Sequence, residues 1–75
     1  MTAAELPAVG SAVRDTGSER VGVVMAYEGP YAQLRPLLGG LEWDAAPDAL
    51  VPLDSGERLR AHVAELNARS RRPPG

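Results

Sequence analysis

Hydrophobic and polar residues alternate in short runs over the first part of the chain. Ser11–Asp15 and Arg20–Tyr27 are typical of strands, and the second run is rich in β-branched residues and lacks a helical period. Gly22 interrupts that run and predicts a bulge or a sharp bend there. Turn-forming residues at 16–18 and 28–30 close the two runs. The pattern predicts consecutive strands joined by tight turns.

The next stretch continues this pattern with a second pair of short strands. Tyr31–Arg35 and Leu41–Asp44 flank a Gly-Gly turn, and Pro36 disfavours a long central strand. A Pro-Asp-Ala-Leu turn and a last short strand follow within Pro47–Leu53. Five short strands of this kind predict a mainly β fold, a small five-stranded barrel over residues 9–53.

The hydrophobic period changes at Asp54. Asp54 can accept backbone N–H bonds at a helix start, and Glu57 stands three residues later, as in a capping box. Three apolar residues then recur at i, i+4 and i+7, namely Leu59, Val63 and Leu66. This spacing places one apolar stripe along an amphipathic helix, and we expect the three residues to form a helix interface.

These patterns divide the chain into four segments. We expect a flexible lead-in at 1–8, the barrel at 9–53, the helix at 54–70 and a disordered tail at 71–75. A chain of 75 residues forms one small domain at most, and such domains are marginally stable, which makes a partner subunit plausible.

Several classes of protein are disfavoured by composition. The chain has no cysteine, no apolar run near the ~20 residues that span a membrane, and no signal-peptide pattern at its start. We therefore expect a soluble, cytoplasmic protein without a membrane partner.

Charge is unevenly distributed along the chain, whose net charge is −2. Residues 1–54 contain eight acids and three arginines, whereas residues 55–75 contain five arginines and two acids. Such asymmetry can mark a basic arm for an anionic partner, or a solvated helix face. The candidate nucleic-acid contacts are Arg58, Arg69, Arg71 and Arg72. No aromatic residue lies near them in sequence to stack on bases.

The order of strands resembles a Src-homology-3-like small barrel, of the Tudor-like and ribosomal kinds. The resemblance rests on five segments that match its strands in order: Val9–Asp15, Glu19–Val24, Tyr31–Arg35, Leu41–Asp44 and Asp48–Leu53. The chain also resembles short proteins of high-GC actinobacteria through Gly-Val-Val-Met, Leu-Arg-Pro and Glu-Trp-Asp. The resemblance implies a fold and no activity. A Tudor-like aromatic cage needs more clustered aromatic residues than this chain has.

The aromatic residues support two interpretations. Together with nearby acids they form the candidate protein-binding set Tyr27, Glu28, Tyr31, Glu42 and Asp44, which could hold a cation or a proline-rich peptide beside Trp43. Alternatively, the rings fill the core of a chain that has few other large side chains. Strand alternation puts Leu41 and Trp43 on one face and Glu42 and Asp44 on the other, so we expect Trp43 to point inward. The tyrosines fit either interpretation.

Little in the sequence favours catalysis or metal binding. His62 is the single histidine, and without cysteines it makes a poor metal site, so we expect a half-buried packing role for it. We identify no catalytic residue, no metal ligand, no cofactor and no small-molecule substrate. An enzyme is the least favoured class.

The sequence therefore favours a small non-catalytic binding module. The expected contact is with another protein, or with a second copy in a homodimer, through the acidic and aromatic face, an edge strand or the C-terminal helix. The alternative is a nucleic-acid-associated regulatory protein that uses the arginine-rich helix and tail.

Overall fold

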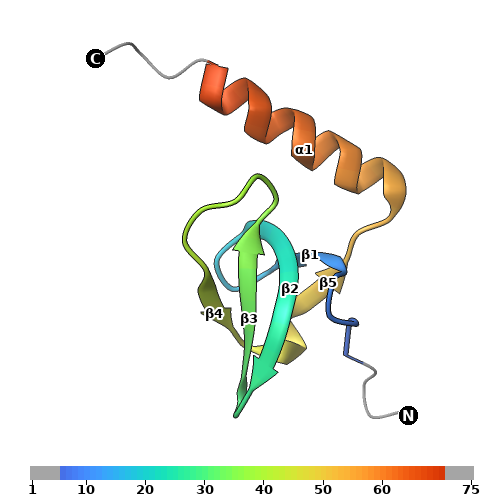
Figure 1. The fold of residues 1–75 in the computed structure, drawn as a ribbon. Helices are drawn as coiled ribbons and strands as arrows, with labels where there is room; N and C mark the ends of the chain where they lie inside the picture. The colour runs from blue at the N-terminus through green and yellow to red at the C-terminus, as the bar shows by residue number, and fades with distance from the viewer. Residues whose placement is uncertain (1–5, 71–75) are drawn as a thin grey trace.

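The computed structural model describes residues 6–70 of the 75-residue chain, with side chains up to Ala68. In this part of the chain five antiparallel strands form one sheet and a single α-helix follows it (Figure 1). The strands are β1 (Ala12–Asp15), β2 (Arg20–Glu28), β3 (Tyr31–Pro36), β4 (Trp43–Ala45) and β5 (Leu50–Pro52). A 3-10 turn, η1 (Pro47–Ala49), precedes β5, and helix α1 spans Ser55–Ser70. The predicted mainly β architecture with one C-terminal helix is confirmed.

The strands are hydrogen-bonded in the order β4-β3-β2-β1-β5, so β4 and β5 are the two edges of the sheet. A closed barrel is therefore not confirmed. Residues 1–5 of the expected lead-in and the expected tail at 71–75 lie outside the described residues.

The bulge in β2 lies at Met25 and not at Gly22, where we expected a bulge or a sharp bend. Val24 pairs with Leu34, but Ala26 pairs with Gln33, so the β2–β3 register shifts between Val24 and Ala26. Side chains alternate along a strand, so without a bulge Val24 and Tyr27 would face opposite sides of the sheet. The extra residue shifts the alternation by one and places Tyr27 on the same side as Val24.

The connection between β3 and β4 is longer than the predicted Gly-Gly turn. The Gly39 N–H donates to the Pro36 carbonyl at 2.9 Å, and Gly39 and Gly40 both have positive φ, 89° and 126°. The loop continues through Glu42, and Leu41 is 87% exposed. Leu41 is therefore not in β4, and our assignment of Leu41 to the inner face beside Trp43 was wrong. The chain turns at Pro36 and again at Gly39 and Gly40, so residues that we assigned to the start of the fourth strand belong to the loop.

One side of the sheet carries the hydrophobic core. Its buried members come from all five strands: Val13, Val24, Ala32, Leu34, Ala45 and Leu50. Tyr27 and Trp43 are partly buried and pack against this cluster, so the inward position that we predicted for Trp43 is confirmed. The core is small, as expected for a chain of this length.

Asp15 is a buried carboxylate at the end of β1, only 4% exposed. Its Oδ1 accepts the Gly17 N–H at 2.9 Å, and its Oδ2 accepts the Ser18 hydroxyl at 2.8 Å and the Trp43 indole N–H at 3.0 Å. Burial alone would raise the pKa of Asp15, but these hydrogen bonds outweigh it and hold the pKa below its ordinary value of 3.8. Asp15 therefore fixes the β1–β2 turn and also binds the edge strand β4.

The Trp43 ring reaches β1 by lying across β2 at Gly22. A Cβ at Gly22 would stand 2.8 Å from Trp43 Cη2 and 2.5 Å from the Arg35 carbonyl oxygen. The Arg20 guanidinium covers the ring, with Cζ 3.8 Å from its centroid. The lack of a side chain at Gly22 thus allows the Trp43 ring and the neighbouring strand β3 to approach closely. This explains the glycine at which we predicted a bulge or a sharp bend.

Helix α1 begins with the predicted capping pair. The Glu57 N–H donates to Asp54 Oδ1 at 2.8 Å, and the Asp54 N–H donates to Glu57 Oε1 at 3.0 Å. This reciprocal arrangement is a capping box with aspartate as the N-cap. In Figure 1 the helix passes over the end of the sheet and the β3–β4 loop, and it does not lie flat against a face of the sheet.

We expect Gly22→Ala to lower the free energy of unfolding by about 1–3 kcal/mol, because the added methyl overpacks against Arg35 and Trp43. Urea denaturation followed by Trp43 fluorescence measures this. Gly56→Ala is the matched control: its Cβ meets only ordinary contacts at 3.5 and 3.6 Å, and alanine favours the helix. An unchanged midpoint for Gly22→Ala would show that the ring does not lie over Gly22.

We expect Asp15→Asn to destabilise the fold by about 1–3 kcal/mol at neutral pH, because the amide cannot accept all three donors. The folded pKa of Asp15 lies below the unfolded value, so its stabilisation is full above about pH 4 and is lost as the pH falls through the folded pKa. The difference between wild type and variant should therefore shrink in acid. Chemical denaturation across pH measures it, with exposed Asp44→Asn as control. A pH-independent difference would contradict this role.

Candidate interaction surfaces

The first candidate surface is the acidic face, defined here as Glu28, Tyr31, Glu42 and Asp44. Glu28 pairs with Tyr31 across β2–β3, and Asp44 pairs with Gln33 across β3–β4. Because alternate residues share a side, Tyr31, Gln33 and Asp44 lie on the side of the sheet opposite the core. All four members of the face are exposed, and Tyr31 is 52% exposed.

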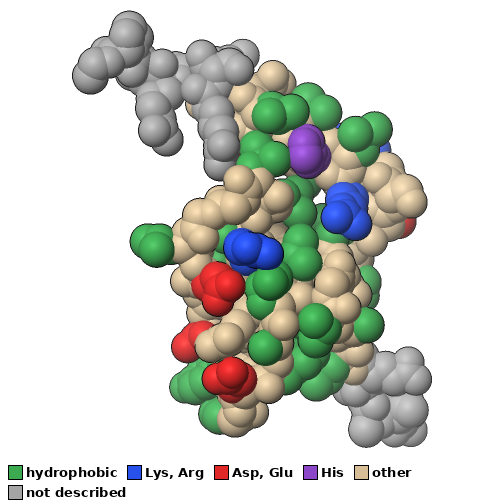
Figure 2. All heavy atoms as spheres, viewed as in Figure 1, with side chains coloured by type: hydrophobic (Ala, Val, Ile, Leu, Met, Phe, Trp, Pro, Cys, Tyr) green, Lys and Arg blue, Asp and Glu red, His purple; other side chains and the backbone are tan. Residues whose placement is uncertain are grey.

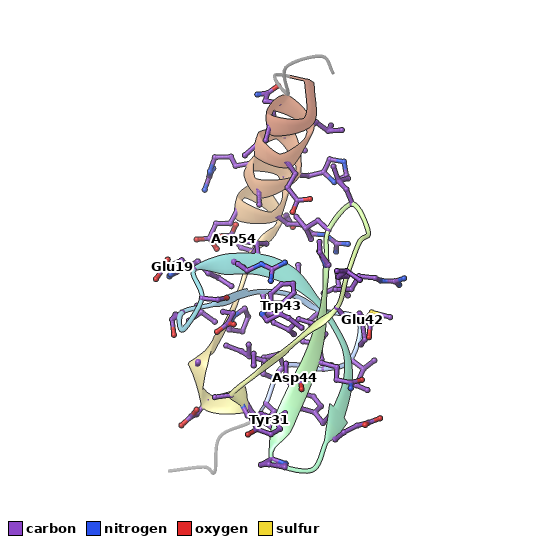
Figure 3. All side chains as sticks on the ribbon, turned by 90° about the vertical axis from the view of Figure 1, so that its left-hand side faces the viewer. Glu19, Tyr31, Glu42, Trp43, Asp44 and Asp54 are labelled. Carbon is purple, nitrogen blue, oxygen red and sulfur yellow. The ribbon has the colours of Figure 1, made fainter. Side chains whose placement is uncertain are left out.

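The members of the acidic face are spread along the sheet and do not converge on one point. In Figure 3 Glu42, Asp44 and Tyr31 follow one another away from the helix end, while Trp43 lies in the interior between the strands. Among the described residues this arrangement offers a flat acidic surface with one exposed ring and no enclosed aromatic groove.

Tyr27 does not belong to this face, although we predicted it there. It pairs with Ala32 on the core side, and its hydroxyl donates to the Pro7 carbonyl. Burial raises the pKa of Tyr27 above its ordinary value. The bulge at Met25 causes the separation, since it turns Tyr27 inward while Tyr31 stays outside. Tyr27 holds the segment before β1 against the sheet.

The second candidate surface is the apolar stripe of α1, formed by Leu59, Val63 and Leu66. These side chains are 64%, 44% and 45% exposed. The more covered helix residues are Ala61 and Glu65, and Glu65 Oε1 accepts the Leu38 N–H of the β3–β4 loop at 3.3 Å. Two residues along a helix turn the side-chain direction by about 200°. The stripe therefore points away from the side by which the helix contacts the β3–β4 loop.

Arginines border the stripe on both sides. One shallow depression beside Leu59 is lined by Ser55, Arg58 and His62, and another is lined by Arg60, Val63, Ala64 and Asn67. Neither contains a carboxylate. The helix acids are engaged elsewhere, since Glu57 caps the helix and Glu65 binds the β3–β4 loop. We call Arg58 and Arg60 the basic rim.

The two candidate surfaces thus differ in charge: the acidic face lies on the sheet, and the basic rim lies on the helix. On the face shown in Figure 2, carboxylates lie over the β3–β4 side of the sheet with a basic side chain directly above them, and the helix presents hydrophobic, histidine and arginine side chains. Exposed Arg35 is on the same side of β3 as Tyr31 and Gln33. The molecule is elongated, with extents of 48 × 25 × 19 Å.

Other predicted residues contribute less to a site. His62 is exposed and not half-buried, because it sits at the edge of the stripe on a helix that turns the stripe to solvent. The side chain of Arg69, and Arg71 and Arg72 altogether, lie outside the described residues. Within the described residues no group of three or more histidines and acids could hold a metal ion. No described helix is long and apolar enough to cross a membrane.

Two features of the structure were not predicted from the sequence. The rim pairs Arg58 with Arg60, which flank Leu59 directly in sequence, so a helical projection would have revealed it. The bond from Trp43 to Asp15 joins residues 28 positions apart, and no local signal marks it.

Comparison with known proteins found no matching family model, no similar curated protein and no similar solved structure. The resemblance to Src-homology-3-like barrels therefore rests on the strand pattern alone.

We expect the double variant Leu59→Gln/Val63→Gln to keep the free energy of unfolding within about 0.5 kcal/mol of wild type, because neither side chain packs in the core. Glutamine is a good helix former, so the helix should persist. Thermal and urea denaturation, with circular dichroism, measure this. Leu34→Ala is the contrasting variant and should cost about 2–5 kcal/mol, because Leu34 is fully buried. Similar losses for both variants would place the stripe against the sheet.

Proposed function

We propose that this protein is a small non-catalytic binding module that docks a partner protein on the apolar stripe of α1. The observation that carries the proposal is the direction of the stripe: Leu59, Val63 and Leu66 are exposed together on the side of the helix opposite its contact with the β3–β4 loop. Single exposed apolar residues are common on protein surfaces. A continuous row of them on a helix supports a role as an interaction face.

The proposal is supported further because the stripe does not contribute to the hydrophobic core. The buried cluster is built from strand residues of the sheet, and none of its members comes from α1. An amphipathic helix usually buries its apolar side. This helix keeps its apolar side available for another surface.

The acidic face and the sheet edges are weaker candidates for the same function. Tyr31 is the only member of the face with an exposed ring, and it stands at the hairpin end away from Glu42. The edge strands β4 and β5 each have three residues, and β5 ends in Pro52, which cannot donate a backbone hydrogen bond. Short edges of this kind resist strand addition.

A Src-homology-3-like barrel remains part of this proposal. The order of the five strands supports it, as does the Trp43–Asp15 bond, which joins β4 to β1 across two intervening strands. Such a cross-link requires a sheet that curls around its core side.

Nucleic-acid binding by the arginine-rich end is the second candidate function, and exposed Arg58 and Arg60 favour it. Its support is weaker because the described helix carries no aromatic ring to stack on bases, and because the chain has a net charge of −2.

Affinity capture tests the proposed function. The tagged protein and the Leu59→Gln/Val63→Gln variant are immobilised and exposed to extract from the source cells, and bound proteins are quantified by mass spectrometry. We expect one or a few proteins to be retained by wild type and reduced by about tenfold or more on the variant, because burial of two apolar side chains is lost.

The matched control is Glu42→Gln/Asp44→Asn, which alters the acidic face and leaves the stripe intact. It should retain the same proteins as wild type. Equal retention by the stripe variant would refute docking on α1, and selective loss from the control would place the contact on the acidic face.

A further inference from the structure

We propose that the partner segment of the stripe is an acidic amphipathic helix, one that presents apolar side chains flanked by carboxylates. This inference rests on the proposed function and adds the chemistry of the partner. It starts from the basic rim: the depressions on the two sides of Leu59 contain Arg58 and Arg60 respectively. An apolar row between two guanidinium groups is complementary to an apolar row between two carboxylates.

The positive character of the rim is not cancelled within the described part of the helix. Glu57 is bonded to the Asp54 N–H at the cap, and Glu65 is turned toward Leu38. Both carboxylates lie on the side away from the stripe. The depressions beside the stripe therefore present arginine, histidine and neutral side chains. The acid nearest to the rim is the N-cap Asp54, which lines a separate depression with Arg58 and accepts the Glu57 N–H.

The same rim disfavours a second copy of this chain as the occupant. If two stripes packed in parallel, Arg58 and Arg60 of one copy would face those of the other, and like charges across an interface are costly. In an antiparallel pair the arginines would face the Leu66 end of the other stripe, where Glu65 is turned toward Leu38 and provides no carboxylate. The acidic face offers a second copy carboxylates but no apolar row, since Tyr31, Gln33 and Arg35 follow one another on that side of β3. Neither arrangement matches both the charge and the apolar character of the stripe.

The shape of the stripe favours a helix as the partner element. Leu59 and Leu66 are seven residues apart, so the row extends about 10 Å along a straight ridge of two turns. A facing helix has apolar side chains at the same spacing as the stripe, and its flanking residues lie opposite Arg58 and Arg60. The apolar row also distinguishes this surface from one for phosphates, which needs no leucine or valine.

The expected interaction is weak and salt-sensitive. Three apolar side chains and two rim arginines form a surface at the small end of specific interfaces. Exposed rim charges mainly raise the rate of association, and salt screens them, so their contribution to binding is small at high salt.

Two fluorescent synthetic peptides test the inference. Both are about 18 residues long, long enough to form helix in part, and carry the same leucine stripe; one has glutamates beside the stripe and the other lysines. Fluorescence anisotropy with the full chain should show saturable binding of the glutamate peptide and at least about tenfold weaker binding of the lysine peptide. Raising NaCl from about 50 to about 500 mM should weaken the glutamate peptide severalfold.

Three variants assign the contact. Leu59→Gln/Val63→Gln should lower affinity for the glutamate peptide by about tenfold or more. Arg58→Glu/Arg60→Glu should reverse the preference, so that the lysine peptide now binds more tightly, which general destabilisation cannot produce. Ala68→Gln, an exposed position outside the stripe, should bind as wild type does. Circular dichroism of each variant reports whether the helix is retained.

Several outcomes would overturn the inference. They are absence of saturable binding to the glutamate peptide, equal binding of both peptides, and unchanged preference after charge reversal. Sedimentation showing a dimer that the stripe variant abolishes would make a second copy the occupant. Tighter, salt-sensitive binding to duplex DNA or to phosphatidylserine vesicles would make an anionic polymer or membrane the occupant. A captured partner that is lost with the stripe but lacks an acidic helix would refute this inference and leave the proposed function standing.

Discussion

The hydrogen bond between the Trp43 indole and the Asp15 carboxylate links most of what is distinctive in this fold. Trp43 belongs to the edge strand β4, and Asp15 ends β1, which is separated from β4 by two strands of the sheet. To make the bond, the ring must cross β2, which requires a residue without a side chain at Gly22. The buried carboxylate in turn must have donors, and the β1–β2 turn provides them through Gly17 and Ser18. One bond thus constrains a turn, a glycine and the curvature of the sheet.

Local patterns predicted the elements, and contacts distant in sequence decided how they meet. The Asp54–Glu57 cap and the helix period are encoded within one turn, so they could be predicted and are confirmed. Gly22 was visible as an exception in a strand, but its reason is a ring 21 residues later. The bulge at Met25 has no glycine or proline to mark it, and it decides that Tyr27 faces inward. Alternation alone therefore could not separate Tyr27 from Tyr31.

The candidate surfaces, too, could be predicted from local sequence patterns only in part. The apolar stripe of α1 was predictable from spacing, and so was its position on one side of the helix. Which way that side would turn was not, because a helix can rotate about its axis without changing its pattern. The Glu65–Leu38 hydrogen bond shows the rotation in this fold: the polar side of the helix meets the β3–β4 loop, and the stripe faces outward. Rotation of the helix thus converts an apparent core element into a surface.

This arrangement has a consequence for the stability of the helix itself. Most helices in proteins are stabilised by packing of their apolar side, and isolated helices of about 12–15 residues are marginal in water. Helix α1 leaves that side exposed and relies on its cap and on contacts of its polar side with the loop. An occupant of the stripe would supply the missing packing and would stabilise the helix by mass action. Docking on the stripe, as proposed, would therefore be coupled to helix order, since the residues that would bind a partner are also those that the helix leaves exposed.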